Sequence, residues 1–87
     1  MNRRVVWETQ AVENLLIVSR QNAALANRCI EAVRRYAHGG GGDVKKLQGN
    51  TDAWRIRVGD MRITFEVDDA LGAISVLTVV NRRDAYD

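Results

Sequence analysis

Four consecutive glycines at positions 39–42 divide this 87-residue chain into two parts with different periodicity. Before them, apolar residues recur every three or four positions, which is the period of an amphipathic helix. After them, apolar and polar residues alternate, which is the period of a strand. One glycine is enough to end a helix, and four in a row also predict a flexible joint. The sequence therefore predicts helices first and a sheet afterwards, in an α+β fold.

The helical part follows a short apolar run and is interrupted once. Val5, Val6 and Trp7 form a β-branched and aromatic run that predicts a first strand, and Thr9 is a candidate N-cap for the helix after it. The polar stretch at 19–22 then breaks the helical period. We expect two antiparallel helices with a tight connection, and a single bent helix is the alternative because neither Gly nor Pro marks the break. The apolar positions are Ala11, Leu15 and Val18 in the first pattern and Ala26, Cys29, Ile30, Val33 and Ala37 in the second.

Three strands are expected after the glycines, in an antiparallel meander. Apolar and polar residues alternate along residues 54–58 and again along 62–67. Gly59-Asp60 and the stretch at 68–72 contain turn-forming residues. Residues 73–80 are almost wholly apolar, as expected of a central strand that is covered on both faces.

Length and composition favour one ordinary globular domain. Chains of this size seldom divide, so we treat residues 1–87 as a single domain. A content of 46% hydrophobic and 28% charged residues is too apolar for disorder and too charged for a membrane protein. No signal peptide is visible, and the lone Cys29 has no partner for an intrachain disulfide. We therefore expect a cytoplasmic protein that does not associate with membranes.

The basic residues of the second half gather on one predicted surface, although the net charge of the chain is only +2. Successive side chains of a strand point to opposite faces, so Arg55 and Arg57 share a face, and the turn after them can return Arg62 to it. The acids lie mostly in turns. This segregation indicates a phosphate-binding surface with one aromatic ring for stacking, although such arginines are also commonly just the solvated face of a sheet. The surface comprises Arg55, Arg57, Arg62, Arg82, Arg83 and Tyr86.

Three short segments carry a more specific signal. They are KLQG at 46–49, WRIRVGDMRI at 54–63 and NRRDAY at 81–86. In this order and spacing they resemble the motifs of the RelE/ParE toxin superfamily, and the resemblance covers essentially the whole chain. It implies a strand at the first segment, a hairpin at the second, and two helices packed on one face of a small antiparallel sheet. The other face of the sheet would then be concave and basic.

The resemblance also implies a function. It implies the toxin of a type II toxin–antitoxin system, acting as a metal-independent endoribonuclease that cuts mRNA in the ribosomal A site without a cofactor. The implied partners are a cognate antitoxin protein, mRNA on the ribosome, and operator DNA only through the antitoxin complex. Two alternatives share the fold, namely a ParE-like inhibitor of DNA gyrase and a catalytically degenerate corepressor that only binds the antitoxin.

The resemblance assigns roles to individual residues. Arg62 matches the arginine that holds the scissile phosphate, Arg82 the basic residue of the closing motif, and Tyr86 the aromatic residue that stacks on or protonates the substrate. These three are the expected catalytic residues. The expected RNA-binding residues are Arg55, Arg57, Arg83 and Lys46.

The chain departs from the family pattern at three places. Asn81 stands where the family has a histidine, Met61 where it has a tyrosine, and two arginines replace a pair that includes lysine in ribosome-dependent members. Arginine stays protonated, so Tyr86 is the only obvious group for proton transfer. We expect catalysis to depend on charge stabilisation and on distortion of the substrate by the ribosome, with weak activity on free RNA.

Several other residues are interpreted as structural. His38 follows the second helical pattern, where it can interact with the helix dipole and the last carbonyls. Cys29 lies on the apolar stripe of that pattern and reads as a small core residue. Trp7 and Trp54 are interpreted as core or interface aromatics. A single Cys and a single His do not make a convincing metal site.

Overall fold

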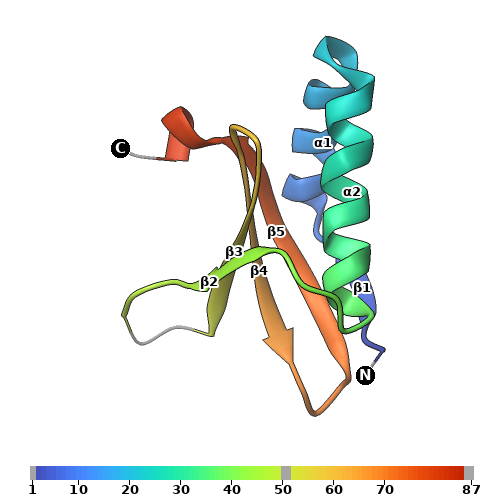
Figure 1. The fold of residues 1–87 in the computed structure, drawn as a ribbon, viewed down its shortest axis with the longest axis vertical. Coiled ribbons are helices and arrows are strands. Elements are labelled where there is room, and N and C mark those ends of the chain that lie inside the picture. Colours follow the sequence, from blue (N-terminus) through green and yellow to red (C-terminus); the bar gives the residue numbers. More distant parts are fainter. Residues whose placement is uncertain (1, 50–51, 86–87) are drawn as a thin grey trace.

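The computed structural model describes residues 2–49 and 52–85. Along the chain its elements are β1 (Arg4–Trp7), α1 (Thr9–Gln21), α2 (Ala23–Ala37), β2 (Asp43–Lys46), β3 (Ala53–Val58), β4 (Met61–Asp68), β5 (Ala73–Asn81) and a short 3₁₀ helix, η1 (Arg82–Ala85). The strands form one sheet in the order β1-β5-β4-β3-β2. The helices α1 and α2 lie side by side on one face of this sheet, and neither of them covers the other face (Figure 1). The predicted α+β fold, with two helices on a sheet and a short N-terminal strand, is confirmed.

The sheet is larger than the predicted meander, and it is mixed. β2, β3, β4 and β5 pair antiparallel in sequence, whereas β1 pairs parallel to β5 at the opposite edge of the sheet from β2. The resemblance implied a strand at the KLQG segment, residues 46–49. β2 ends at Lys46, so only the first residue of that segment is in a strand. Local alternation did not indicate β2, since four residues are too few to display a period.

The connection between the helices depends on Asn22. This residue is extended, with φ of −159°, and its side-chain Oδ1 accepts a hydrogen bond from Leu25 N–H at 3.0 Å. Its own N–H donates to the last turn of α1, at Val18 O. Asn22 therefore ends one helix and caps the next, and the alternative of a single bent helix is wrong. The predicted N-cap at Thr9 is also wrong, because Glu8 occupies that position and its side chain makes no capping hydrogen bond.

The glycine run forms a defined turn at the end of α2. His38 is the C-cap, its backbone N–H donates to Arg34 O, and Gly39 follows in the left-handed region with φ of +88°. Gly40 N–H donates to Arg35 O at 2.8 Å, and a Cβ at Gly40 would lie 2.5 Å from Arg35 Cγ. Any side chain at position 40 would collide with the last turn of the helix, so two of the glycines are required by geometry.

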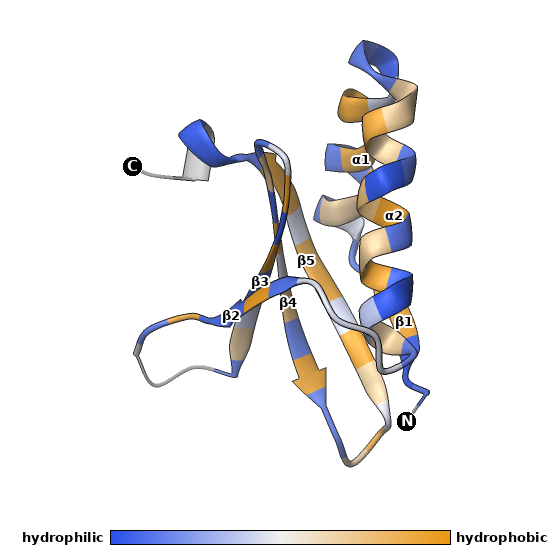
Figure 2. Ribbon diagram, viewed as in Figure 1, coloured by the Kyte–Doolittle hydropathy of each residue, from blue (hydrophilic) through white to orange (hydrophobic). Residues whose placement is uncertain are grey.

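The core lies between the helices and the inner face of the sheet. Apolar and polar segments alternate along the strands, and apolar segments recur along the helices (Figure 2). The ring of Tyr36 in α2 packs on that of Phe65 in β4, with centroids 5.3 Å apart. Cys29 is fully buried, as predicted, and this burial raises the pKa of its thiol. The buried residues of this core are Ala11, Val18, Ala26, Cys29, Val33, Ala37, Ile56, Met61, Ile63, Phe65, Ile74, Val76 and Val79, with Trp7 and Trp54 half-buried against them.

The apolar run of β5 lacks a clear period because the strand contains a β-bulge. The register pairs Phe65 with Val76 and Thr64 with Thr78, so Leu77 is the extra residue of a β-bulge. The bulge changes the phase of the strand, and Val79 rather than Thr78 is buried after Val76. The helices cover only one face of β5, so the prediction of cover on both faces is wrong.

Candidate nucleic-acid interface

Strand register gathers the basic side chains of the second half on the face opposite the core. Residues directly paired across an antiparallel ladder share a face. Arg57 of β3 pairs with Arg62 of β4 on one side and with Asp43 of β2 on the other. Arg55 pairs with Lys45 of β2. Three neighbouring strands therefore present charged groups on one surface.

A cleft of about 480 Å³ opens on this surface, and we call it the basic cleft. Eight of the residues that the structure describes line it, of which six are basic and none is acidic. Like charges at this density repel one another, and they attract a polyanion whose phosphates can lie between them. The lining residues are Lys45, Lys46, Leu47, Gln48, Arg55, Arg57, Arg62 and Arg82.

Arg82 reaches the basic cleft from η1, far along the chain from the β3–β4 hairpin. Its backbone N–H donates to Asp60 O at 2.7 Å, which ties the start of η1 to the turn of that hairpin. The turn itself is tight because Gly59 adopts φ of +57°. The half-buried Arg82 side chain is therefore placed beside the hairpin by a backbone contact, independent of its own charge.

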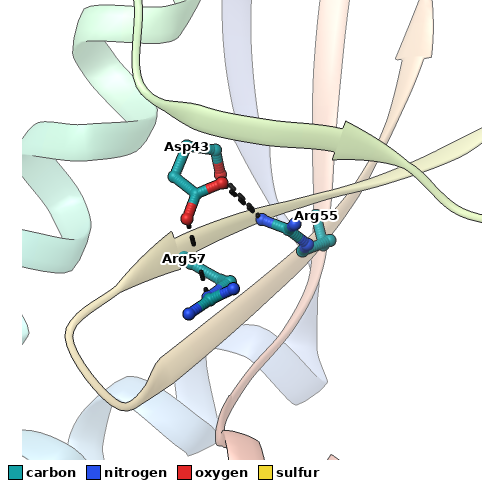
Figure 3. A network of polar contacts seen from close by, with 3 residues as sticks. All are labelled: Asp43, Arg55 and Arg57. Carbon is teal, nitrogen blue, oxygen red and sulfur yellow. Dashed lines mark hydrogen bonds and ion pairs between the residues drawn. The ribbon is translucent and has the colours of Figure 1, made fainter.

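A carboxylate lies against two of the arginines, as Figure 3 shows. Arg55 Nη1 donates to both Asp43 Oδ1 and the backbone carbonyl of Asp43, each at 3.0 Å. Arg57 Nε lies 3.6 Å from Asp43 Oδ2. The hydrogen bond from Arg55 lowers the pKa of Asp43, and the charges of Arg55, Arg57 and Arg82 add to that effect. Asp43 is therefore ionised at neutral pH and offsets part of the positive charge of the face.

Solved structures identify the architecture around this cleft. The RelE–RelB complex from Pyrococcus horikoshii contains a chain that is 27% identical, with a TM-score of 0.73 over 94% of this chain and 97% of that one. The toxin–antitoxin complex RelBE2 from Mycobacterium tuberculosis gives a TM-score of 0.78 at 18% identity, over 94% and 93% of the two chains. The YoeB/ParE toxin from Agrobacterium tumefaciens gives 0.74 at 18% identity, over 90% and 96%.

This chain has the RelE-like toxin fold. The resemblance to the RelE/ParE superfamily expected from the three sequence segments is thereby confirmed. No protein-family model matches the chain, and a search of curated proteins also finds no match. Several of the similar structures are complexes of a toxin with an antitoxin.

The structure brings most, but not all, of the expected site residues of the RelE-like chain together in the basic cleft. Arg55, Arg57, Arg62, Arg82 and Lys46 line the basic cleft. Arg83 is exposed on η1 and does not line it. Its backbone N–H donates to Asn81 Oδ1 at 3.0 Å. Tyr86 lies outside the described residues.

Lys46 and Lys45 reach the basic cleft in different ways. Lys46 pairs with Trp54, which points toward the core, and its Nζ lies 5.9 Å from the centroid of the indole ring. Lys45 pairs with Arg55 and therefore points to the arginine face. The sequence pattern did not indicate Lys45 or Asp43, since their place depends on the register of β2, which is set by pairing with β3.

The same sheet face has an acidic end. Asp52, Glu66, Asp68 and Asp69 line a separate shallow pocket with Val67 and Ser75. Arg3 pairs with Asp69 at 3.0 Å, and Asp68 Oδ1 accepts a hydrogen bond from Leu71 N–H at 3.1 Å. This acidic end lies at the termini of β3 and β4 farthest from the Gly59–Asp60 turn, so charge changes sign along the strands.

Two further features concern other classes of site. Across residues 2–49 and 52–85, no helix has both the length and the apolar character needed to cross a membrane. In the same ranges, no three His, Cys, Asp or Glu residues come together in a group that could hold a metal ion.

Proposed function

We propose that this protein is the toxin of a type II toxin–antitoxin system and that it cuts mRNA on the ribosome. The observation that supports this most strongly is the basic cleft, in which cations from β2, β3, β4 and η1 meet and no residue of 2–49 or 52–85 adds an acidic group to the lining. Neutralising several phosphates at once is the main source of affinity for single-stranded RNA. The RelE-like fold, seen in toxins of toxin–antitoxin complexes, supports the same proposal.

The proposed reaction uses the RNA's own nucleophile. The 2′-hydroxyl gives its proton to solvent water, and its oxygen forms a bond to the adjacent phosphorus while the bond from phosphorus to the 5′ oxygen breaks, which leaves a cyclic phosphate and a 5′-hydroxyl. Arg62 and Arg82 stabilise the negative charge that grows on the phosphate oxygens, since fixed cations need no reorganisation during the step. Tyr86 donates the proton that the leaving 5′ oxygen requires.

Proton removal is the weaker half of this mechanism. A guanidinium remains protonated at neutral pH, so neither Arg55 nor Arg57 accepts the proton of the 2′-hydroxyl. Met61, which replaces a tyrosine of the family pattern, is buried in the core and is 4% exposed. The protein therefore relies on charge stabilisation and on positioning of the mRNA by the ribosome, and we expect slow cleavage of free RNA.

An antitoxin is the proposed protein partner, and operator DNA is reached only through the complex with it. Several of the similar structures contain a toxin bound to its antitoxin. α1 also exposes apolar side chains that a partner protein can cover, at Val12, Leu16 and Ile17. The leading test of this partner is co-purification with the product of a small acidic reading frame that overlaps the toxin gene.

The deciding experiment expresses the chain without antitoxin and maps cleavage of a translated mRNA, with gyrase supercoiling assayed in parallel. We expect ribosome-dependent cuts that disappear in Arg62→Ala and Tyr86→Ala. Arg20→Ala is the matched control, because Arg20 is exposed at the end of α1, away from the cleft. Loss of supercoiling with intact mRNA would instead assign the protein to gyrase inhibition. If neither activity appears, the remaining function is that of an antitoxin-binding corepressor.

A further inference from the structure

Asp43 opens β2 directly after the glycine turn and lies on the arginine face. Its register partner is Arg57, and its carboxylate also meets Arg55, so one acid contacts two of the cleft arginines. The side chain of Asp43 remains 56% exposed, whereas that of Arg55 is only 14% exposed. The Asp43 carboxylate is therefore open to solvent, whereas its partner Arg55 is nearly enclosed.

The two arginines are held by Asp43 to different degrees. Arg55 Nη1 is shared between the carboxylate and the backbone carbonyl of the same residue, both at 3.0 Å, which fastens β2 to β3. The contact to Arg57 is longer, at 3.6 Å, and the Arg57 side chain is 41% exposed. A charge-assisted hydrogen bond normally measures about 2.7–2.9 Å, so the Arg57 pair is the looser one.

A phosphate and a carboxylate recognise guanidinium through the same N–H donors. An RNA phosphate that approaches Arg57 therefore meets the Asp43 carboxylate at the same donors, and it must also overcome the repulsion between two anions. An anion that approaches Arg55 finds the Nη1 group already occupied and the side chain mostly enclosed. The two contacts have different consequences for RNA binding.

We propose that Asp43 is an internal competitor of the RNA phosphate: it occupies Arg57 until RNA displaces it, and it keeps Arg55 as a fastener of β2 instead of a substrate ligand. This inference rests on the proposed function, because it assumes that the basic cleft binds RNA. On this proposal Asp43 determines specificity, because RNA that makes no contacts beyond the basic cleft binds more weakly when it has to displace the carboxylate.

Asp43→Asn tests this inference, because it removes the charge and keeps a side chain of similar size. The probe is a fluorescein-labelled single-stranded RNA with 2′-O-methyl groups, which prevent cleavage, and binding is followed by anisotropy from 50 mM to 200 mM salt. We expect several-fold tighter binding by Asp43→Asn. We also expect a steeper slope of log K against log salt, because the carboxylate that the variant removes repels RNA most strongly at low salt.

Two control variants separate competition from a general change in charge. Asp43→Glu keeps the carboxylate and should bind RNA close to the wild-type affinity. Asp52→Asn loses the same charge at the acidic end of the face, and its salt slope should change much less than that of Asp43→Asn. Thermal unfolding shows whether each variant is folded.

Equal or weaker binding by folded Asp43→Asn, with an unchanged salt slope, overturns the inference and leaves the proposed function intact. Absence of RNA binding by the wild type and by Asp43→Asn at 50 mM salt contradicts the proposed function itself, and the inference fails with it. The two failures are therefore distinguishable.

A second measurement needs no variant and applies even if Asp43→Asn does not fold. The same RNA is titrated into wild-type protein while the Nε–H resonances of Arg55 and Arg57 are followed by NMR. We expect the Arg57 resonance to shift on binding and the Arg55 resonance to stay nearly fixed. A shift of both resonances together, or of Arg55 alone, overturns the division of roles between them.

Discussion

The two faces of the β3–β4 hairpin are built from alternate residues of the same strands, yet one packs in the core and the other lines the basic cleft. On the inner face, Ile56, Ile63 and Phe65 are at most 2% exposed and pack under the helices. On the outer face, Arg57 and Arg62 pair directly across the ladder and line the basic cleft. Because the side-chain period of a strand is two, a slip of one residue would exchange these sets. The buried face therefore fixes the register that brings like charges together on the other.

The largest expected effect is on the inner face. Phe65→Ala should lower the free energy of unfolding by about 3–5 kcal/mol, because Phe65 is fully buried and loses its contact with the Tyr36 ring. Urea denaturation followed by circular dichroism measures this change. The total free energy of unfolding of a small domain is roughly 5–15 kcal/mol, so such a loss removes a large part of it.

Glu66→Ala is the matched control for that prediction, since Glu66 is the next residue of β4 and is exposed. Its effect on unfolding should stay within about 0.5 kcal/mol. Similar losses of unfolding free energy in Phe65→Ala and Glu66→Ala would contradict the view that the inner face stabilises the fold and the outer face serves RNA binding.

The second prediction concerns Arg82 on the outer side. Arg82→Ala should slow ribosome-dependent cleavage by about 100-fold, the usual effect of removing one group that stabilises transition-state charge. It should leave the free energy of unfolding nearly unchanged, because the contact to Asp60 uses the backbone N–H, which alanine retains. Single-turnover cleavage and urea denaturation on the same sample give both values. A variant that loses activity only in proportion to its lost stability would assign Arg82 a structural role.

The third prediction uses the acidic end of the outer face. Glu66→Lys should raise RNA affinity by roughly two- to fivefold at low salt, because it replaces a repulsive charge on the surface that carries the basic cleft. The gain should fade as salt rises, since charges on an exposed surface are screened over about 10 Å at 0.1 M salt. Anisotropy titrations at two salt concentrations measure it. A gain that persists undiminished at high salt would point to a direct contact at position 66 instead of a general field.

The smallest effect is a pH dependence that arises from Asp43. Its pKa lies below the ordinary aspartate value, principally because of the hydrogen bond from Arg55. A carboxyl whose pKa is lower in the folded state stabilises the fold above its unfolded pKa, and this contribution is lost as pH falls through the folded pKa. In Arg55→Ala the pKa of Asp43 should rise toward its ordinary value, as measured by ¹³C NMR titration of the carboxyl group. An unchanged pKa in that variant would show that Arg55 does not hold this carboxylate in solution.

The parts that could be predicted from sequence are those determined by neighbouring residues. Alternation around Ile56 placed Arg55 and Arg57 on one face, and the Gly59-Asp60 turn indicated the return of Arg62. The polar break at 19–22 indicated two helices, and Asn22 is the residue that separates them. Local periods and turns are sufficient for such elements.

The parts that could not be predicted depend on contacts distant in sequence. Lys45 and Asp43 join the arginine face only through the register of β2 against β3. Arg82 lines the basic cleft and Arg83 does not, which depends on the path of η1 after its contact with the hairpin turn. The bulge at Leu77 changes the phase of β5, and no local residue signals it.

The most direct test of the central claim is to map where RNA binds on the protein surface. Backbone amide resonances of the ¹⁵N-labelled wild-type chain are followed while the non-cleavable RNA is added. We predict that the largest shifts occur in β2, at Arg57 and Arg62 on the hairpin, and at Arg82, with little change at the acidic end or on the helices. Shifts that centre on α1 and α2, or that spread equally over both ends of the sheet face, would contradict the assignment of RNA binding to the basic cleft.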